Sequence, residues 1–148
     1  MITYRQEDWF DCKEEIKPLA ETHFNECMAT QGGAQFDLDE TGLDGLAKAG
    51  LMHITTARDG LDLVAYIVNL IMPRHTLFNR PFASQMGWYV KPKYRGRVGL
   101  QILNKSEEFL KGKVDVMLGM HTATTDCSKL FSRLGWMQSE INYMKWVA

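Results

Sequence analysis

The segment from Val90 to Leu100 combines features that favour anion binding. It reads as the end of a β-strand at Pro92, then a short turn of arginine and glycine, then the start of an amphipathic helix. Unpaired backbone N–H groups converge at a helix N-terminus, where the helix dipole adds partial positive charge. Four basic side chains accompany the turn: Lys91, Lys93, Arg95 and Arg97. The sequence therefore predicts that a phosphate-bearing ligand binds here.

A second motif lies nearer the C-terminus. Residues 130–136, LFSRLGW, place an aromatic residue, a Leu-Gly pair and a second aromatic residue at the end of a predicted helix. Together the two motifs resemble those of the GNAT N-acetyltransferases, whose acyl-CoA-binding signature is R/Q-x-x-G-x-G/A between a strand and a helix. The resemblance covers roughly the C-terminal two thirds of the chain.

Within that superfamily the chain is most similar to small phage- and prophage-encoded members. These pair an early His-aromatic-x-Glu, here His23 to Glu26, with a His-Thr after a strand, here His121-Thr122. The turn departs from the signature by being about one residue shorter. With Arg95 at the first position of the signature, Arg97 stands where the central glycine is expected, and Gly99 takes the final small position.

The resemblance implies acetyl-CoA or CoA as co-substrate, with its pyrophosphate on the backbone amides of the turn and its pantetheine arm along the strand. The cofactor-binding residues that it implies are Trp88, Tyr89, Val90, Arg95, Gly96, Arg97, Val98, Gly99, Leu100, Thr124 and Phe131. Thr124 can hydrogen-bond a pantetheine amide. Phe131 stands where many members have a tyrosine that protonates the leaving thiolate. Phenylalanine cannot donate a proton, but a thiolate is a good leaving group and scarcely needs one.

Two histidines are candidate catalytic residues. His121 closes the strand after the crossover helix, where the resemblance places the acyl-transfer centre, and an imidazole suits deprotonation of an amine near neutral pH. His121 is equally well explained as a strand-end residue before a helix capped by Thr125 or Asp126. His23, with Glu26, would line a substrate pocket. His23 and Cys27 are one helical turn apart, but no third ligand is in place, so core packing is favoured and no metal is expected.

Composition limits the class of protein. With 148 residues and 17.0 kDa, the chain is expected to form a single domain over residues 1–148. A net charge of −1 argues against a nucleic-acid binder with a basic surface. No apolar run has membrane-spanning length, and the N-terminus does not resemble a signal peptide. Cys12, Cys27 and Cys127 form no disulfide framework, which favours the cytoplasm, that of the host for a phage-encoded protein.

The hydrophobic pattern predicts the elements in outline. A helical stripe from Trp9 to about Thr30 is interrupted at Pro18, which predicts a kink or two consecutive helices. Asp39 or Thr41 caps a short helix that ends at Gly50. Strands are expected over residues 51–58, 61–72, 82–90, 114–120 and 141–147, and further helices from the Arg/Gly turn to about 112 and over 126–134. Asp59-Gly60 predicts a hairpin between the first two strands.

These elements define an α/β fold. Strand, helix and strand over residues 82–120 form a crossover unit, so the two strands run parallel with a right-handed connection. Hairpins make the remaining pairs antiparallel. We therefore expect a GNAT-like mixed, mostly antiparallel sheet with helices on both faces. The resemblance implies that the parallel pair splays apart to admit the pantetheine arm.

The leading hypothesis is an acyl-CoA-dependent N-acyltransferase, acetyl by default, that transfers the acyl group to a primary amine of a small molecule or protein by direct attack. The acceptor pocket would lie between the first helices and the loop over residues 73–81. The alternative is a non-catalytic GNAT-fold binding protein, of the phage virion or host-inhibitor type, that can still bind CoA; Phe131 and the shortened turn favour it. A nucleotide-binding fold lacks a P-loop or a full GxGxxG. The sequence leaves the oligomeric state open.

Overall fold

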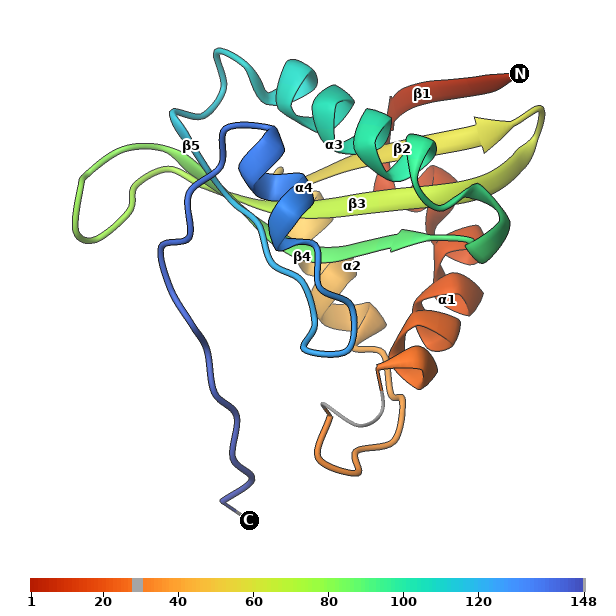
Figure 1. Ribbon diagram of the computed structural model, residues 1–148, viewed down its shortest axis with the longest axis horizontal. Coiled ribbons are helices and arrows are strands. Elements are labelled where there is room, and N and C mark those ends of the chain that lie inside the picture. Colours follow the sequence, from red (N-terminus) through yellow and green to blue (C-terminus); the bar gives the residue numbers. More distant parts are fainter. Residues whose placement is uncertain (28–30, 148) are drawn as a thin grey trace.

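The computed structural model of the protein describes residues 1–27 and 31–147. Its strands form a five-stranded sheet in the order β1-β2-β3-β4-β5 (Figure 1). The strands are β1 (Ile2–Glu7), β2 (Met52–Asp59), β3 (Asp62–Met72), β4 (Phe82–Val90) and β5 (Val116–Leu118). The first three pairings are antiparallel, and β4 pairs with β5 in parallel. The predicted mixed sheet and the hairpin after Asp59 are confirmed.

Helices cover both faces of the sheet, as predicted (Figure 1). The helices are α1 (Trp9–Glu26), α2 (Glu40–Lys48), α3 (Arg97–Leu110) and α4 (Ser128–Arg133), with a short 3-10 helix η2 (Pro92–Tyr94) before α3. The core on the α1 side consists of Trp9, Cys12, Ile16, Ile54, Leu63, Tyr66, Val68 and Tyr89. The core on the α3 side consists of Ala57, Val64, Ala65, Ile67, Val90, Val98, Ile102 and Leu103.

The N-terminal helices begin at acidic caps. Asp8 accepts a hydrogen bond from Phe10 N (2.9 Å) at the start of α1. Asp39 accepts one from Gly42 N (2.9 Å), which confirms Asp39 as the cap of α2. α1 continues through Pro18 as one helix, so the expectation of two consecutive helices was wrong. Residues 28–30, the expected end of this helix, lie outside the described residues.

The parallel pair of strands separates early. β4 pairs with β5 only from Phe82 to Ser84, so the strand predicted over residues 114–120 is shorter than expected. Residues 85–90 of β4 continue without a β5 partner. Gln85 Nε2 donates to Met120 O (2.9 Å) just past the last pair. On its other side, β4 has an extra residue, Met86, opposite the Val68–Asn69 step of β3. Such a bulge bends and twists a strand, and here it adjoins the point of separation.

Two expectations at the chain ends were incomplete or wrong. β1 was not predicted, yet it pairs with β2 from Ile2 to Glu7. The strand predicted over residues 141–147 does not form: in the described part of that segment Ile141 is 67% and Tyr143 92% exposed, and the chain leaves the body of the molecule (Figure 1). An alternating apolar pattern gives a strand only where a partner edge is available, and β5 offers a short one.

Candidate active site

The turn before α3 provides unpaired backbone donors. Gly96 has φ 91° and ψ −102°, a conformation suited to glycine, and no side chain caps the helix that begins at Arg97. The first backbone bond of the helix runs from Leu100 N to Gly96 O (3.0 Å). The amides of Arg97, Val98 and Gly99 therefore have no acceptor within the helix, which is the geometry that the predicted anion site requires.

The two glycines of the turn have different roles. Gly96 makes the positive-φ turn that ends the connection from β4. Gly99 is buried, and a Cβ added there would lie 3.8 Å from Trp88 Cζ2 and 3.8 Å from Val90 Cγ2. Gly99 therefore faces β4, and a Cβ there would make only ordinary contacts with the strand.

The basic side chains near the turn do not all face the anion site. Lys91 Nζ pairs with Asp62 (2.8 Å). Arg95 turns towards α1: its Nε donates to Val90 O (3.0 Å), its Nη2 pairs with Glu26 Oε2 (2.5 Å), and its guanidinium lies 5.8 Å from the centre of the Tyr89 ring. Arg97 is exposed at the first position of α3. Of the two predicted arginines, Arg97 is thus the one whose place suits phosphate directly.

The end of β4 divides its side chains between the two faces of the sheet. Trp88 and Val90 lie on the α3 side, where the Trp88 ring is 5.9 Å from that of Phe131. Tyr89 lies on the α1 side. Trp88 Nε1 is buried and has no hydrogen-bond partner in the described part of the chain. The three predicted residues therefore lie on the part of β4 that has no β5 partner, where Val90 O accepts from Arg95 Nε, and their side chains do not form one surface.

His121 was expected to close the strand, but β5 ends at Leu118 and His121 is exposed in the loop that follows. Both of its ring nitrogens have polar neighbours. Nδ1 lies 3.1 Å from Thr122 O, and Nε2 lies 3.6 Å from Asp126 Oδ1. Its ring centre is 6.3 Å from that of Phe131, on the α4 side. Asp126 also accepts a hydrogen bond from Ser128 N (2.8 Å) at the start of α4, and the Ser128 hydrogen bonds lower the pKa of that carboxyl. The N-cap residue of α4 is Cys127 and no side chain caps this helix, so the expectation that Thr125 or Asp126 is its cap was wrong.

The same loop carries Thr124. Its hydroxyl lies 3.1 Å from that of Thr122, which in turn accepts a hydrogen bond from Cys27 Sγ (3.6 Å). Thr124 is exposed, so its hydroxyl is accessible to a ligand. The loop after β5 is thereby connected to the end of α1, across the gap where β4 and β5 separate.

His23 lies in the last turn of α1, against the opposite face of β4. Its ring centre is 5.5 Å from that of Tyr89, and burial lowers the pKa of His23. Tyr89 OH donates to Glu26 Oε1 (3.4 Å), and burial, together with the Glu26 charge, raises the pKa of Tyr89. The structure therefore does not bring the two candidate histidines to one face. It instead groups His23, Glu26, Tyr89 and Arg95.

Sequence reasoning identified Glu26 only through the His-aromatic-x-Glu pattern and did not foresee its partners. Arg95 and Tyr89 are far from Glu26 in the chain, so no local signal could join them. Gln85, which spans the gap between β4 and the chain after β5, was also missed. Its one signal was a polar residue in an apolar strand.

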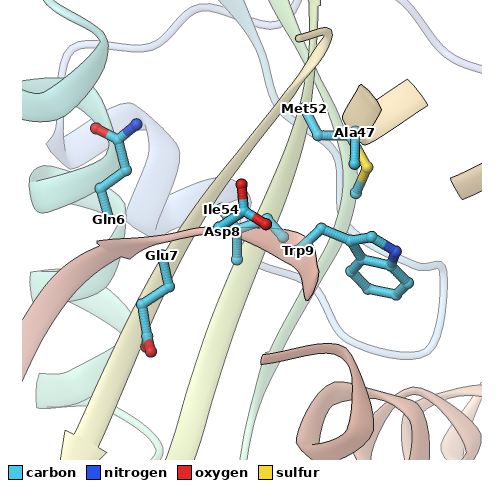
Figure 2. A pocket seen from close by; sticks show the side chains of 7 residues that line it. All are labelled: Gln6, Glu7, Asp8, Trp9, Ala47, Met52 and Ile54. Carbon is cyan, nitrogen blue, oxygen red and sulfur yellow. The ribbon is translucent and has the colours of Figure 1, made fainter. Parts of the chain in front are cut away.

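A separate cavity of about 330 Å³ lies where β1 meets α1, and it contains none of the predicted site residues (Figure 2). Its lining consists of Gln6, Glu7, Asp8, Trp9, Ala47, Met52 and Ile54. Glu7 turns away from its centre in Figure 2 and pairs with Arg58 (2.9 Å). β1 and β5 are at opposite edges of the sheet, so this cavity is remote from the separation of β4 and β5.

Within residues 1–27 and 31–147, no group of three or more His, Cys, Asp or Glu side chains is arranged to hold a metal ion. None of the described helices is both long and apolar enough to cross a membrane.

The sequence matches no protein-family model, and it matches no curated protein. Several solved structures with the same fold are acetyltransferases. An aminoglycoside acetyltransferase from an uncultured soil metagenomic sample, in complex with sisomicin, superposes with a TM-score of 0.75 at 12% identity, covering 99% of this chain and 96% of that one. A predicted acetyltransferase from Clostridium acetobutylicum, with acetyl-CoA, gives 0.72 at 13% identity, covering 99% and 96%.

A third structure, the aminoglycoside N-acetyltransferase AAC(6')-Iy in complex with CoA, gives a TM-score of 0.73 at 18% identity, covering 98% of this chain and 95% of that one. The similarity extends over the whole chain, beyond the two motifs that carried the resemblance. The GNAT fold predicted from those motifs is therefore established.

Proposed function

We propose that the protein is an N-acyltransferase that moves an acyl group, acetyl by default, from acyl-CoA to a primary amine. The observation that carries the proposal is the separation of β4 from β5 beside the uncapped start of α3. An acyl-CoA combines a pyrophosphate with a chain of amides and a thioester. The N-terminus of α3 suits the pyrophosphate, and the part of β4 without a β5 partner suits the amides.

The residues of the turn and of β4 would hold CoA in different ways. The amides of Arg97, Val98 and Gly99 bind the pyrophosphate, and the Arg97 side chain adds charge. Main-chain groups of residues 85–90 bind the pantetheine amides, as an added strand would. Trp88 Nε1 supports this placement, because a buried donor without an acceptor is costly and a ligand carbonyl would satisfy it.

The chemical step is a direct attack. The neutral amine nitrogen forms a bond to the thioester carbonyl carbon, the C–S bond breaks, and CoA leaves as a thiolate. The proton that the amine loses passes to a base. We assign this role to His121, because it lies beside Phe131 in the loop after β5, and Asp126, 3.6 Å from Nε2, would stabilise the imidazolium that forms when the ring takes up the proton. His23 is the second candidate: burial lowers its pKa, so its imidazole is neutral at pH 7.

The neighbours in structure support the class of co-substrate and acceptor. One was solved with acetyl-CoA and another with CoA, and two are named as acetyltransferases of aminoglycosides, which are amines. Phe131 packs against Trp88 and lies near His121, so in this proposal it forms an apolar wall of the cleft. The thiolate then leaves without a proton from that position.

Charge reversal at Arg97 tests the CoA site. Arg97→Glu should raise the dissociation constant for CoA, measured by calorimetry, by about tenfold or more, since a charged hydrogen bond is lost and a repulsion gained. A glutamate at the first position of a helix interacts favourably with the helix dipole, so the variant should still fold. Lys111→Glu makes the same charge change at the other end of α3 and should leave CoA affinity within about twofold. Equal losses in both variants would place the site elsewhere.

An activity assay distinguishes the two hypotheses, an N-acyltransferase and a non-catalytic binding protein. The purified protein is incubated with acetyl-CoA and a panel of primary amines, and acetylated products are detected by mass spectrometry. Co-purified CoA is sought in the same way. Acetylated amine is the expected result. Tight CoA binding without turnover on any amine would favour the non-catalytic binding protein, for which Phe131 and the shortened turn are the structural arguments.

A further inference from the structure

The protein separates its charges between the two faces of the sheet. Residues 7–48, which contain α1 and α2, carry eleven acidic and three basic side chains. Residues 74–147, which contain α3 and α4, carry twelve basic and five acidic side chains. The net charge of −1 conceals this asymmetry. A polyanion such as CoA is attracted to the α3 side, and a cation to the α1 side.

One ion pair joins the two sides at the proposed site. Arg95 belongs to the turn of the anion site, but its guanidinium contacts Glu26 of α1 at 2.5 Å. The side chains are 49% and 36% exposed, and exposed pairs of this kind contribute only about 0–1 kcal/mol. The ion pair itself therefore separates at little cost, and when Arg95 moves to the phosphates it also exchanges its bond to Val90 O (3.0 Å) and its contact with the Tyr89 ring for phosphate contacts. Tyr89 OH, which donates to the other Glu26 oxygen at 3.4 Å, still holds the carboxylate after Arg95 leaves.

We infer that Glu26 binds a cationic group of the acceptor, and that Arg95 covers Glu26 until the phosphates of CoA draw the guanidinium away. The inference rests on the proposed function. Arg95 is next to Gly96 in the turn, so its long side chain has the phosphates and Glu26 as alternative partners. CoA then binds before the amine, because only the CoA complex has an uncovered carboxylate.

This arrangement specifies the class of acceptor. The reacting nitrogen must lose its proton before it attacks, so it cannot also be the cation that Glu26 holds. The acceptor therefore carries at least one further ammonium group, and a diamine or polyamine fits where a simple alkylamine does not. The excess of acidic side chains on the α1 side favours the same polycationic class.

The first experiment compares putrescine with n-butylamine, which has the same carbon chain but a single amine. With acetyl-CoA, Glu26→Gln should lower kcat/KM for putrescine by about tenfold or more and change that for n-butylamine by less than about twofold. Glu21→Gln is the matched control, because Glu21 is an exposed glutamate of the same helix. It should change neither value. Equal losses for both amines in Glu26→Gln would overturn the inference.

The second experiment uses binding alone. Calorimetry should detect putrescine binding to the wild type in the presence of CoA and not in its absence. Arg95→Gln should bind putrescine without CoA, and should bind CoA more weakly. Putrescine binding that does not depend on CoA in the wild type, or no putrescine binding with CoA present, would overturn the inference. If the protein binds CoA and acetylates amines equally well without Glu26, the inference is wrong but the proposed function stands. If the protein does not bind CoA, both the inference and the proposed function are wrong.

Discussion

At the scale of single residues, the structure assigns different surroundings to residues that the sequence grouped together. His23 packs on Tyr89 on the α1 side, and His121 lies near Phe131 on the α4 side. Arg95 and Arg97 are two positions apart, yet Arg95 contacts Glu26 and Arg97 is exposed at the helix start. The base that we propose, His121, and the proposed acceptor-binding residue, Glu26, therefore come from opposite faces of β4.

The role of His121 gives a prediction at this scale. His121→Ala should lower kcat by about 10²–10⁴-fold, the usual contribution of general-base catalysis, and flatten the acidic side of the pH–rate profile. CoA affinity should barely change, because the imidazole lies outside the phosphate site. His23→Ala should leave that profile in place. If His121→Ala retains full kcat and the wild-type profile, the base is His23 or a bound water.

At the scale of elements, α3 carries both the anion site and the packing of the α3-side core. Its buried face includes Val98, Ile102 and Leu103, and its first turn provides the free amides. The element that we propose binds phosphate is thus fixed by apolar burial, so its first amides are held in place without a ligand. This is the physical basis for assigning specificity to the backbone and only part of the affinity to side-chain charge.

The two glycines of this element give a matched pair of variants. Gly96→Ala should lower the free energy of unfolding by about 1–2 kcal/mol, since a Cβ is strained at φ 91°. Gly99→Ala should be neutral or slightly stabilising, because its Cβ would meet Trp88 and Val90 at 3.8 Å, an ordinary contact. Urea unfolding measures both. Equal destabilisation would mean that the helix begins elsewhere.

At the scale of the whole molecule, the sheet separates two cores. The α3 side contains a buried histidine whose ring nitrogens have no hydrogen-bond partner among the described residues. His53 of β2 is 3% exposed, its ring lies 6.5 Å from Phe109 of α3, and neither ring nitrogen has a hydrogen-bond partner in the described part of the chain. Burial, with a smaller contribution from Lys113, lowers the pKa of His53 to about 4. The folded protein therefore keeps this imidazole neutral.

Acid should consequently destabilise the protein through His53. An unfolded histidine takes up a proton near pH 6.5, which the folded state resists down to about pH 4. The free energy of unfolding should fall across that interval, by about 2 kcal/mol at pH 5 and about 3 kcal/mol at pH 4. Urea unfolding at pH 7 and pH 5 measures this, and His53→Leu should remove most of the difference. An unchanged pH dependence in that variant would contradict the prediction.

The sequence by itself determined the features that depend on neighbouring residues. The pattern placed β4 at Phe82–Val90, Asp39 was one of the two candidate caps of α2, and Asp59-Gly60 marked the hairpin. The Arg/Gly turn before a helix was recognisable for the same reason, because its geometry arises within a few residues. The parallel pairing of β4 and β5 also followed, since a crossover helix permits no other direction.

Only the tertiary structure decided what depends on distant partners. β1 forms because β2 offers it an edge, whereas residues 141–147 have an apolar pattern but no strand beside them in the part of the chain that the structure describes. The point where β4 leaves β5, the opposite faces of the two histidines and the contact of Arg95 with Glu26 are likewise set by packing. Hydrogen bonds between strands and ion pairs between helices and turns join residues that no local pattern links.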